Sequence, residues 1–187
     1  MKDVITENYQ LMFGDCLERM KEIPSGSIDL VLTDPPYGTT ACKWDSVIDF
    51  TLMWEQLKRI IKPNGAIVLF GSEPFSSALR ISNIKQYKYD WVWVKNRATG
   101  VLNAKKQPLR TYENISVFYS KQPMYNPQGL IPYNKNSRNS KRDSEVYGKG
   151  QTNSYIQEWS NYPKNILEFD SVQRTQHPTQ KPVALLV

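Results

Sequence analysis

Apolar runs of strand length alternate with amphipathic stretches over the first 120 residues. The runs predicted as strands are 9–13, 28–33, 66–70, 89–94 and 115–119. Helices are predicted over 16–22, 48–61 and 75–84, and the Lys-Pro-Asn-Gly sequence at 62–65 is expected to end the second of them. Strands that alternate with helices in this way are typical of an α/β fold with a mostly parallel sheet.

The pattern changes after residue 120. Residues 122–163 are rich in Pro, Gly, Asn, Ser and Lys, contain five tyrosines and show no clear period. A segment of this length without regular structure is usually functional or disordered when it occurs in a compact domain. We therefore expect three parts, namely a core over 1–120, an inserted loop-rich lobe over 121–165, and a return to the core over 166–187.

Positive charge is concentrated in this lobe and just before it. The chain has a net charge of +6, and residues 95–150 hold eleven Lys and Arg against three acidic residues, so this segment is +8 and the remainder is −2. Such a segment indicates a phosphate-rich partner, although a solvated polar loop would explain the same charges. The basic side chains predicted to contact nucleic acid are Lys43, Lys105, Lys106, Arg110, Lys135, Arg138, Lys141 and Arg142.

The composition disfavours several other classes of protein. Two cysteines are too few for a disulfide framework, and a single histidine disfavours a His-rich zinc site. No apolar run approaches the ~20 residues of a membrane helix, and the N-terminus has no apolar segment of a secretion signal. These features predict a reduced, cytoplasmic protein with no bound metal and no membrane partner.

The sharpest candidate for chemistry is the sequence Thr-Asp-Pro-Pro-Tyr-Gly at 33–38, directly after the strand predicted over 28–33. Ligand sites of open α/β sheets lie beyond the carboxyl ends of the strands, so Asp34 and Tyr37 are expected at such a site. A carboxylate, a backbone carbonyl fixed by prolines and an aromatic face suit a planar ring that carries an amino group. A proline turn with a capping aspartate and a packed tyrosine is the alternative interpretation.

With three further stretches, this motif resembles the S-adenosylmethionine-dependent DNA amino-methyltransferases of the β class, which modify adenine N6 or cytosine N4. The further stretches are Gly-Asp-Cys-Leu at 14–17, the helix–turn–strand sequence at 57–70, and His-Pro-Thr-Gln-Lys-Pro at 177–182. The likeness reaches from residue 11 to residue 187 and implies a Rossmann-like methyltransferase fold with a target-recognition lobe. In this family D-P-P-Y is typical of adenine enzymes, so the resemblance favours adenine over cytosine.

The resemblance also implies roles for individual residues. The catalytic residues would be Asp34, Pro35, Pro36 and Tyr37, which hold and stack on a base flipped out of double-stranded DNA. The cofactor is expected to be S-adenosylmethionine. The residues expected to contact it are Asp15, Cys16, Leu17, Asp34, His177, Thr179 and Lys181. Lys181 suits this role because the carboxylate of a bound cofactor needs a cation or a hydrogen-bond donor.

The chain departs from the family in one respect, because no glycine-rich D-P-F-x-G-S-G-T-T loop follows the His-Pro-Thr-Gln-Lys-Pro stretch. Two hypotheses follow. In the first, the chain is a methyltransferase whose cofactor site is completed by a missing portion, a homodimer partner or a second chain. In the second, it is a non-catalytic DNA-binding remnant. Cytosine C5 methylation is disfavoured because Cys16 and Cys42 lack the context of a nucleophile, and no phosphate-binding loop motif occurs.

Overall fold

The structure is a computed structural model and describes residues 2–40, 42, 45–138, 145, 148, 154–177 and 179–186. It divides into two compact units. The larger unit comprises Met1–Met124 together with Asn165–Val187, and the smaller one comprises Tyr125–Lys164.

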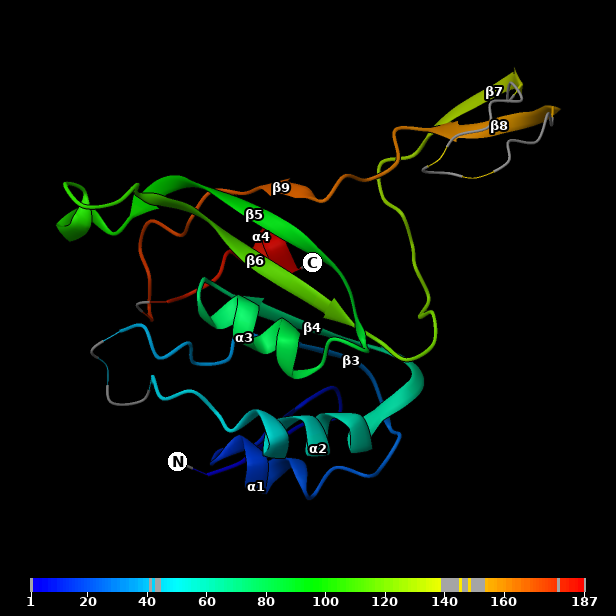
Figure 1. The fold of residues 1–187 in the computed structure, drawn as a ribbon. Coiled ribbons are helices and arrows are strands. Elements are labelled where there is room, and N and C mark those ends of the chain that lie inside the picture. Colours follow the sequence, from blue (N-terminus) through cyan, green and yellow to red (C-terminus); the bar gives the residue numbers. More distant parts are fainter. Residues whose placement is uncertain are drawn as a thin grey trace. The chain divides into compact units, whose positions relative to one another are not determined.

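The larger unit is built on a five-stranded sheet (Figure 1). In spatial order its strands are β3 (Ile28–Thr33), β4 (Ile61–Gly71), β6 (Arg110–Phe118), β5 (Tyr87–Thr99) and β9 (Ile166–Glu168). A separate two-stranded hairpin of β1 (Val4–Ile5) and β2 (Gln10–Leu11) lies near the N-terminus. The strand predicted over 9–13 is therefore present only as a short hairpin arm.

The α/β class is confirmed, whereas the strand directions are more mixed than predicted. β3 is parallel to β4, and β5 is parallel to β9, but β6 runs antiparallel to both of its neighbours. The antiparallel pairing arises because β5 and β6 form one long hairpin. A 3-10 turn at Val101–Asn103 closes this hairpin, and it follows Gly100, whose φ of 88° lies in the left-handed region that glycine adopts without strain.

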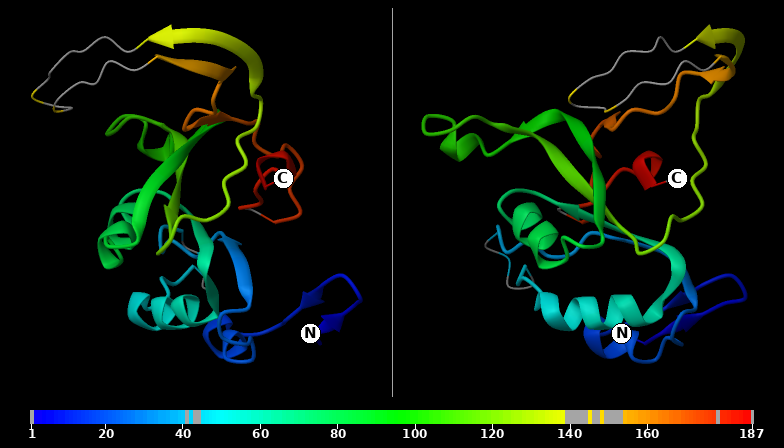
Figure 2. Two further views of the ribbon diagram at one scale, coloured as in Figure 1. Left: turned by 90° about the vertical axis from the view of Figure 1, so that its right-hand side faces the viewer. Right: turned by 45° about the vertical axis from the view of Figure 1, so that its right-hand side comes forward.

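Among the described residues, four helices accompany the sheet. They are α1 (Cys16–Met20), α2 (Phe50–Ile60), α3 (Phe75–Ser82) and α4 (Val183–Leu186). Figure 2 shows α2 and α3 on one side of the sheet and α4 on the other. Leu57 of α2 and Leu79 of α3 are buried in one cluster with Ile67 and Leu69 of β4. In the described part of the chain, none of the helices is long and apolar enough to cross a membrane.

The second face of the sheet is buried as well. Val68 and Phe70 alternate with Ile67 and Leu69 along β4, so they point to the opposite face, as successive strand residues must. There they pack with Trp93 of β5 and with partly buried apolar residues of the C-terminal segment. Burial on both faces explains why β4 appears in the sequence as a continuous apolar run.

The boundary between α2 and β4 differs from the prediction. Residues 62–65 were expected to end the helix, but α2 ends at Ile60 and these residues are the first part of β4. Pro63 favours an extended conformation for the residue before it, which suits a strand as well as a helix end. Gly65 lies against β3, where an added Cβ would come within 2.8 Å of the Asp29 carbonyl oxygen. A side chain at this position would therefore push the two strands apart.

The smaller unit contains an antiparallel pair of strands, β7 (Ile131–Arg138) and β8 (Ser154–Ser160), drawn side by side in Figure 2. The sequence did not predict these strands. Most of their residues are exposed, including Tyr133, Tyr155 and Trp159, so there is no buried face to impose alternation of polar and apolar positions.

Candidate active site

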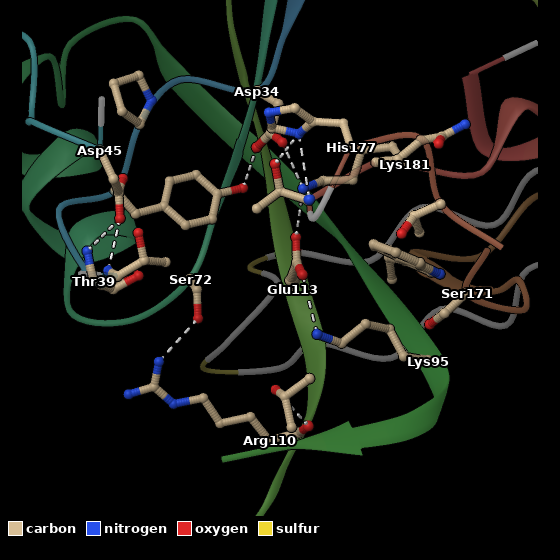
Figure 3. Close-up of a pocket in the computed structure, with 18 of the residues that line it drawn as sticks. Asp34, Thr39, Asp45, Ser72, Lys95, Arg110, Glu113, Ser171, His177 and Lys181 are labelled. Atoms are coloured by element: carbon tan, nitrogen blue, oxygen red, sulfur yellow. Dashed lines mark hydrogen bonds and ion pairs between the residues drawn. The ribbon is translucent and has the colours of Figure 1, made fainter. Parts of the chain in front are cut away.

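A cavity of about 490 Å³ opens at the carboxyl end of β3, within the larger unit (Figure 3). Its lining comes from segments far apart in the sequence. These are the turn after β3, Ser72 after β4, the outer part of the β5–β6 hairpin, and the chain from Ser171 to Lys181. Volumes of about 300–1,000 Å³ are usual for small-molecule and cofactor sites.

Asp34 and Tyr37 form the hydrogen-bonded centre of this cavity. The Tyr37 hydroxyl donates to Asp34 Oδ1 at 2.5 Å. Burial raises the pKa of Tyr37 far above its ordinary value, and the carboxylates of Asp34 and Glu113 raise it further. The phenol therefore stays protonated and acts as a hydrogen-bond donor to Asp34.

A chain of alternating charges continues from Asp34. Lys181 Nζ lies 2.6 Å from Asp34 Oδ2 and 3.2 Å from Glu113 Oε2, and Lys95 Nζ lies 3.0 Å from Glu113 Oε1. Figure 3 shows Lys181 between the two carboxylates, with Lys95 beyond Glu113. The side chains of Lys181, Glu113 and Lys95 are exposed by only 10%, 15% and 9%. With two cations and two anions, the cluster is neutral as a whole.

The loop after the D-P-P-Y turn is held by Asp45. Its Oδ1 accepts from the backbone N–H of Gly38 at 2.9 Å, and its Oδ2 accepts from those of Thr39 and Thr40 at 2.9 and 2.7 Å. The side chain of Thr40 and these backbone donors lower the pKa of Asp45 to about 2, although burial opposes the effect. An ionised Asp45 thus ties residues 38–40 into a closed turn beside Tyr37.

The ring of Tyr37 already has an aromatic neighbour. It stacks on Phe75 of α3, with ring centroids 5.1 Å apart and an angle of 29° between the planes. Lys181 Nζ lies 5.7 Å from the centroid of the Tyr37 ring. A base that stacks on Tyr37 would therefore have to use the ring face opposite Phe75.

The structure brings together all four residues predicted for catalysis and part of those predicted for the cofactor. The predicted site residues that line the cavity are Asp34, Pro35, Pro36, Tyr37, His177, Thr179 and Lys181. Within the last segment, Thr179 Oγ1 lies 3.1 Å from Nδ1 of His177, so these two side chains support each other.

Asp15, Cys16 and Leu17 do not line this cavity, and their assignment to the cofactor stays a prediction. Asp15 caps α1, because its carboxylate accepts from the backbone N–H of Leu17 at 2.8 Å. Leu17 packs against the core cluster beneath α2. Burial raises the pKa of the Cys16 thiol, and Asp15 raises it further, so this thiol is a poor nucleophile.

The basic residues predicted to contact DNA are dispersed over the described chain. Arg110 is at the start of β6, lines the cavity and donates from Nη1 to Ser72 Oγ at 3.4 Å. Lys105 and Lys106 are exposed in the turn of the β5–β6 hairpin. Lys135 and Arg138 are exposed on β7 of the smaller unit. Three others, Lys43, Lys141 and Arg142, lie outside the described residues.

Three residues of the site were not predicted from the sequence, namely Lys95, Glu113 and Asp45. A signal existed for Glu113, because it lies only two positions before the apolar run at 115–119, and a glutamate close to buried residues usually has a partner. The same signal exists for Lys95, which follows directly after the apolar run at 89–94. For Asp45 nothing in the local sequence pointed to a loop-closing carboxylate.

Comparison with known proteins identifies the family. The family model for the N6/N4 DNA methylases matches residues 28–187. The chain belongs to this family. DNA adenine methyltransferase YhdJ of Escherichia coli (strain K12) is 29% identical in an alignment 193 residues long, gaps included, that covers 94% of this chain and 64% of that protein. Type II methyltransferase M.HinfI of Haemophilus influenzae is 32% identical in an alignment 105 residues long, gaps included, that covers 44% of this chain and 29% of that protein.

Among solved structures, the PvuII DNA methyltransferase, described as cytosine-N4-specific, superposes with a TM-score of 0.60. The alignment covers 92% of this chain and 65% of that chain at 16% identity, which shows a shared fold. The Rossmann-like methyltransferase fold expected from the sequence is thereby confirmed. The chain spans less than two thirds of the length of each of these three relatives.

Proposed function

We propose that the cavity around Asp34 is the base-binding site of a DNA methyltransferase that transfers a methyl group from S-adenosylmethionine to adenine N6. The observation that carries the proposal is the place of Asp34, beyond the carboxyl end of β3 in a cavity large enough for a base. The family of the chain supports the reaction type. The name of YhdJ, a DNA adenine methyltransferase, supports the choice of base.

The amino group of adenine is a weak nucleophile because its lone pair is delocalised into the ring. Asp34 would accept one amino hydrogen, and the backbone carbonyl of the buried Pro35 would accept the other. Two fixed acceptors orient the nitrogen and favour the positive charge that develops on it. Tyr37 and Lys181 already hold the carboxylate of Asp34, so it needs little rearrangement when a base enters.

The residues that line the cavity also suit S-adenosylmethionine, which would supply an electrophilic methyl group. The Lys181 ammonium has three N–H donors, of which one hydrogen-bonds Asp34, so a donor is left for a carboxylate such as that of the cofactor. Thr179 and Ser171 add hydroxyl groups to the lining of the cavity. Lys181 would thereby hold the cofactor's carboxylate and Asp34 at the same time.

The proposed macromolecular partner is double-stranded DNA, from which the target base would be flipped into the cavity. Extruding a base costs a few kcal/mol, which stacking and hydrogen bonds in the pocket must offset. The exposed basic and aromatic residues of the smaller unit, among them Lys135, Arg138 and Trp159, would contact the phosphates and grooves.

The test is methyl transfer by the whole protein. The protein is incubated with S-adenosylmethionine labelled in the methyl group and with unmethylated DNA, and the digested nucleosides are then separated. Label in N6-methyladenine supports the proposal. Label in N4-methylcytosine would support a DNA methyltransferase but overturn the choice of adenine as its target base. DNA binding without any label in the nucleosides would favour a non-catalytic DNA-binding protein.

A further inference from the structure

Glu113 is the partly buried link between two lysines of the cavity. It lies on β6, opposite Trp93 of β5, so the β5–β6 hairpin fixes its place in the sheet. Lys95 Nζ donates to its Oε1 at 3.0 Å. Among the described residues no hydrogen-bond donor is well aligned with its buried Oε2, and the ammonium of Lys181, 3.2 Å away, compensates that atom's charge.

This arrangement ties the position of Lys181 to Glu113. A buried carboxylate without a counter-charge is costly, so Glu113 stabilises the ammonium of Lys181 at this place in the cavity. Lys181 belongs to the segment that ends in α4, whereas Asp34 follows β3. Without Glu113, the hydrogen bond from Lys181 to Asp34 would be the main constraint on the long and flexible side chain of Lys181.

Glu113 also limits how much of the charge of Asp34 is neutralised. A lysine paired with Asp34 alone would direct its full charge at that carboxylate, whereas here two carboxylates share it. Asp34 thus keeps more of its capacity to accept a hydrogen from a base. Lys95 holds the other oxygen of Glu113, which turns Oε2 towards Lys181.

We propose that Glu113 is a positioning residue that acts through Lys181 on Asp34, with Lys95 as its anchor. This inference rests on the proposed methyl transfer. Glu113 does not touch the base, so its removal lowers turnover and leaves the affinity for DNA nearly unchanged.

The test compares Glu113→Gln, Lys181→Met and the double variant with the wild type in the whole protein. Glu113→Gln is expected to lower kcat by about 10- to 100-fold, the scale on which residues that orient a site residue act, with KM for DNA within about threefold. Because Glu113 acts through Lys181, the double variant is expected to be no worse than the worse single variant. Calorimetric titration with S-adenosylmethionine gives a second readout, in which Glu113→Gln weakens binding no more than Lys181→Met does.

Two further variants make the test specific. Glu113→Asp keeps the charge and is expected to have a kcat between those of the wild type and Glu113→Gln, and it also decides the question if Glu113→Gln does not fold. Asp29→Asn removes an exposed carboxylate paired with Lys62 outside the cavity and should leave kcat unchanged.

The outcomes separate this inference from the proposed function. If the wild type shows no methyl transfer, the proposed function is overturned, and so is this inference, which rests on it. An active wild type with Glu113→Gln within about twofold of it overturns this inference alone. If the kcat losses of the two single variants multiply in the double variant, Glu113 acts independently of Lys181. This result would also overturn the inference.

Discussion

The hydroxyl of Tyr37 donates to Asp34 Oδ1 across 2.5 Å, so the tyrosine of the D-P-P-Y turn holds the aspartate of the same turn. The pKa of Tyr37 is raised far above its ordinary value by burial and by the neighbouring carboxylates, which keeps the donor hydrogen in place. Two prolines between the residues limit the backbone conformations of the turn. The motif is therefore a hydrogen-bonded unit before any base enters it.

Replacing Asp34 tests the centre of the proposed mechanism. Asp34→Ala is expected to reduce methyl transfer by more than about 100-fold, because it removes an acceptor aimed at the developing charge. The side chain of Asp34 is partly exposed, and Glu113 still pairs with Lys181 when Asp34 is removed, so the variant should fold and keep the circular dichroism spectrum of the wild type. Residual kcat within about tenfold of the wild type, or about 1.4 kcal/mol in the barrier, would remove Asp34 from the mechanism.

Tyr37 combines a hydrogen-bonding role with a stacking role, and two variants separate them. Tyr37→Phe keeps the ring and its contact with Phe75 but removes the donor to Asp34, so it is expected to lower kcat without weakening DNA binding. Tyr37→Ala also removes the stacking surface, worth ~1–3 kcal/mol per base. It should therefore weaken binding to a duplex with a mismatched adenine more than binding to a matched duplex. Equal losses on the two duplexes would mean that Tyr37 only packs against Phe75.

The sequence predicted those parts of the fold in which apolar residues are continuous. The strand predicted over 28–33 is β3 with the same bounds, and the predicted helix over 48–61 contains α2. β5 and β6 were predicted too short, as 89–94 and 115–119, because their outer halves are polar. Those halves form a hairpin that projects beyond the buried part of the sheet, where no burial is needed to keep the strands paired.

Two of the three unpredicted residues of the site, Glu113 and Lys95, were missed for the same reason. Glu113 and Lys95 lie at the ends of the predicted strands, in the polar halves that the pattern left out. The contacts of Glu113 with Lys181 and of Lys181 with Asp34 link residues far apart in sequence. No local period or motif encodes such a pairing. The D-P-P-Y turn, by contrast, was recognisable because its chemistry lies in consecutive residues after a buried strand.

Asp45 gives the loop beside Tyr37 a pH-dependent stability. The pKa of its carboxyl is lowered from 3.8 to about 2 by the Thr40 side chain and the backbone donors, so its stabilising effect is complete above pH 3.8 and is lost as the pH falls towards 2. Asp45→Asn is expected to lower the free energy of unfolding at neutral pH by about 1–3 kcal/mol, with a smaller difference near pH ~3. Urea denaturation at both pH values measures this, with Asp29→Asn as the control.

A difference between wild type and Asp45→Asn that stays constant down to the lowest pH would contradict this role of the Asp45 charge. Kinetics add a second readout, because residues 38–40 lie next to the catalytic turn. If the closed loop orders that turn, the variant should also lose part of kcat at neutral pH, where it remains folded.

The last prediction concerns where DNA affinity resides. Each phosphate neutralised on duplex DNA contributes about −0.9 to the slope of log K against log salt. Replacing Lys135, Arg138, Lys141 and Arg142 with alanine should therefore make this slope shallower by roughly two to four units if most of them touch phosphate. The matched control removes four charges elsewhere in the chain, from Lys2, Lys21, Lys58 and Lys85, all exposed. A slope that changes equally in both variants would show a general effect of net charge. An unchanged slope in the first variant would place the DNA path nearer the catalytic loop and Arg110, which lines the cavity itself.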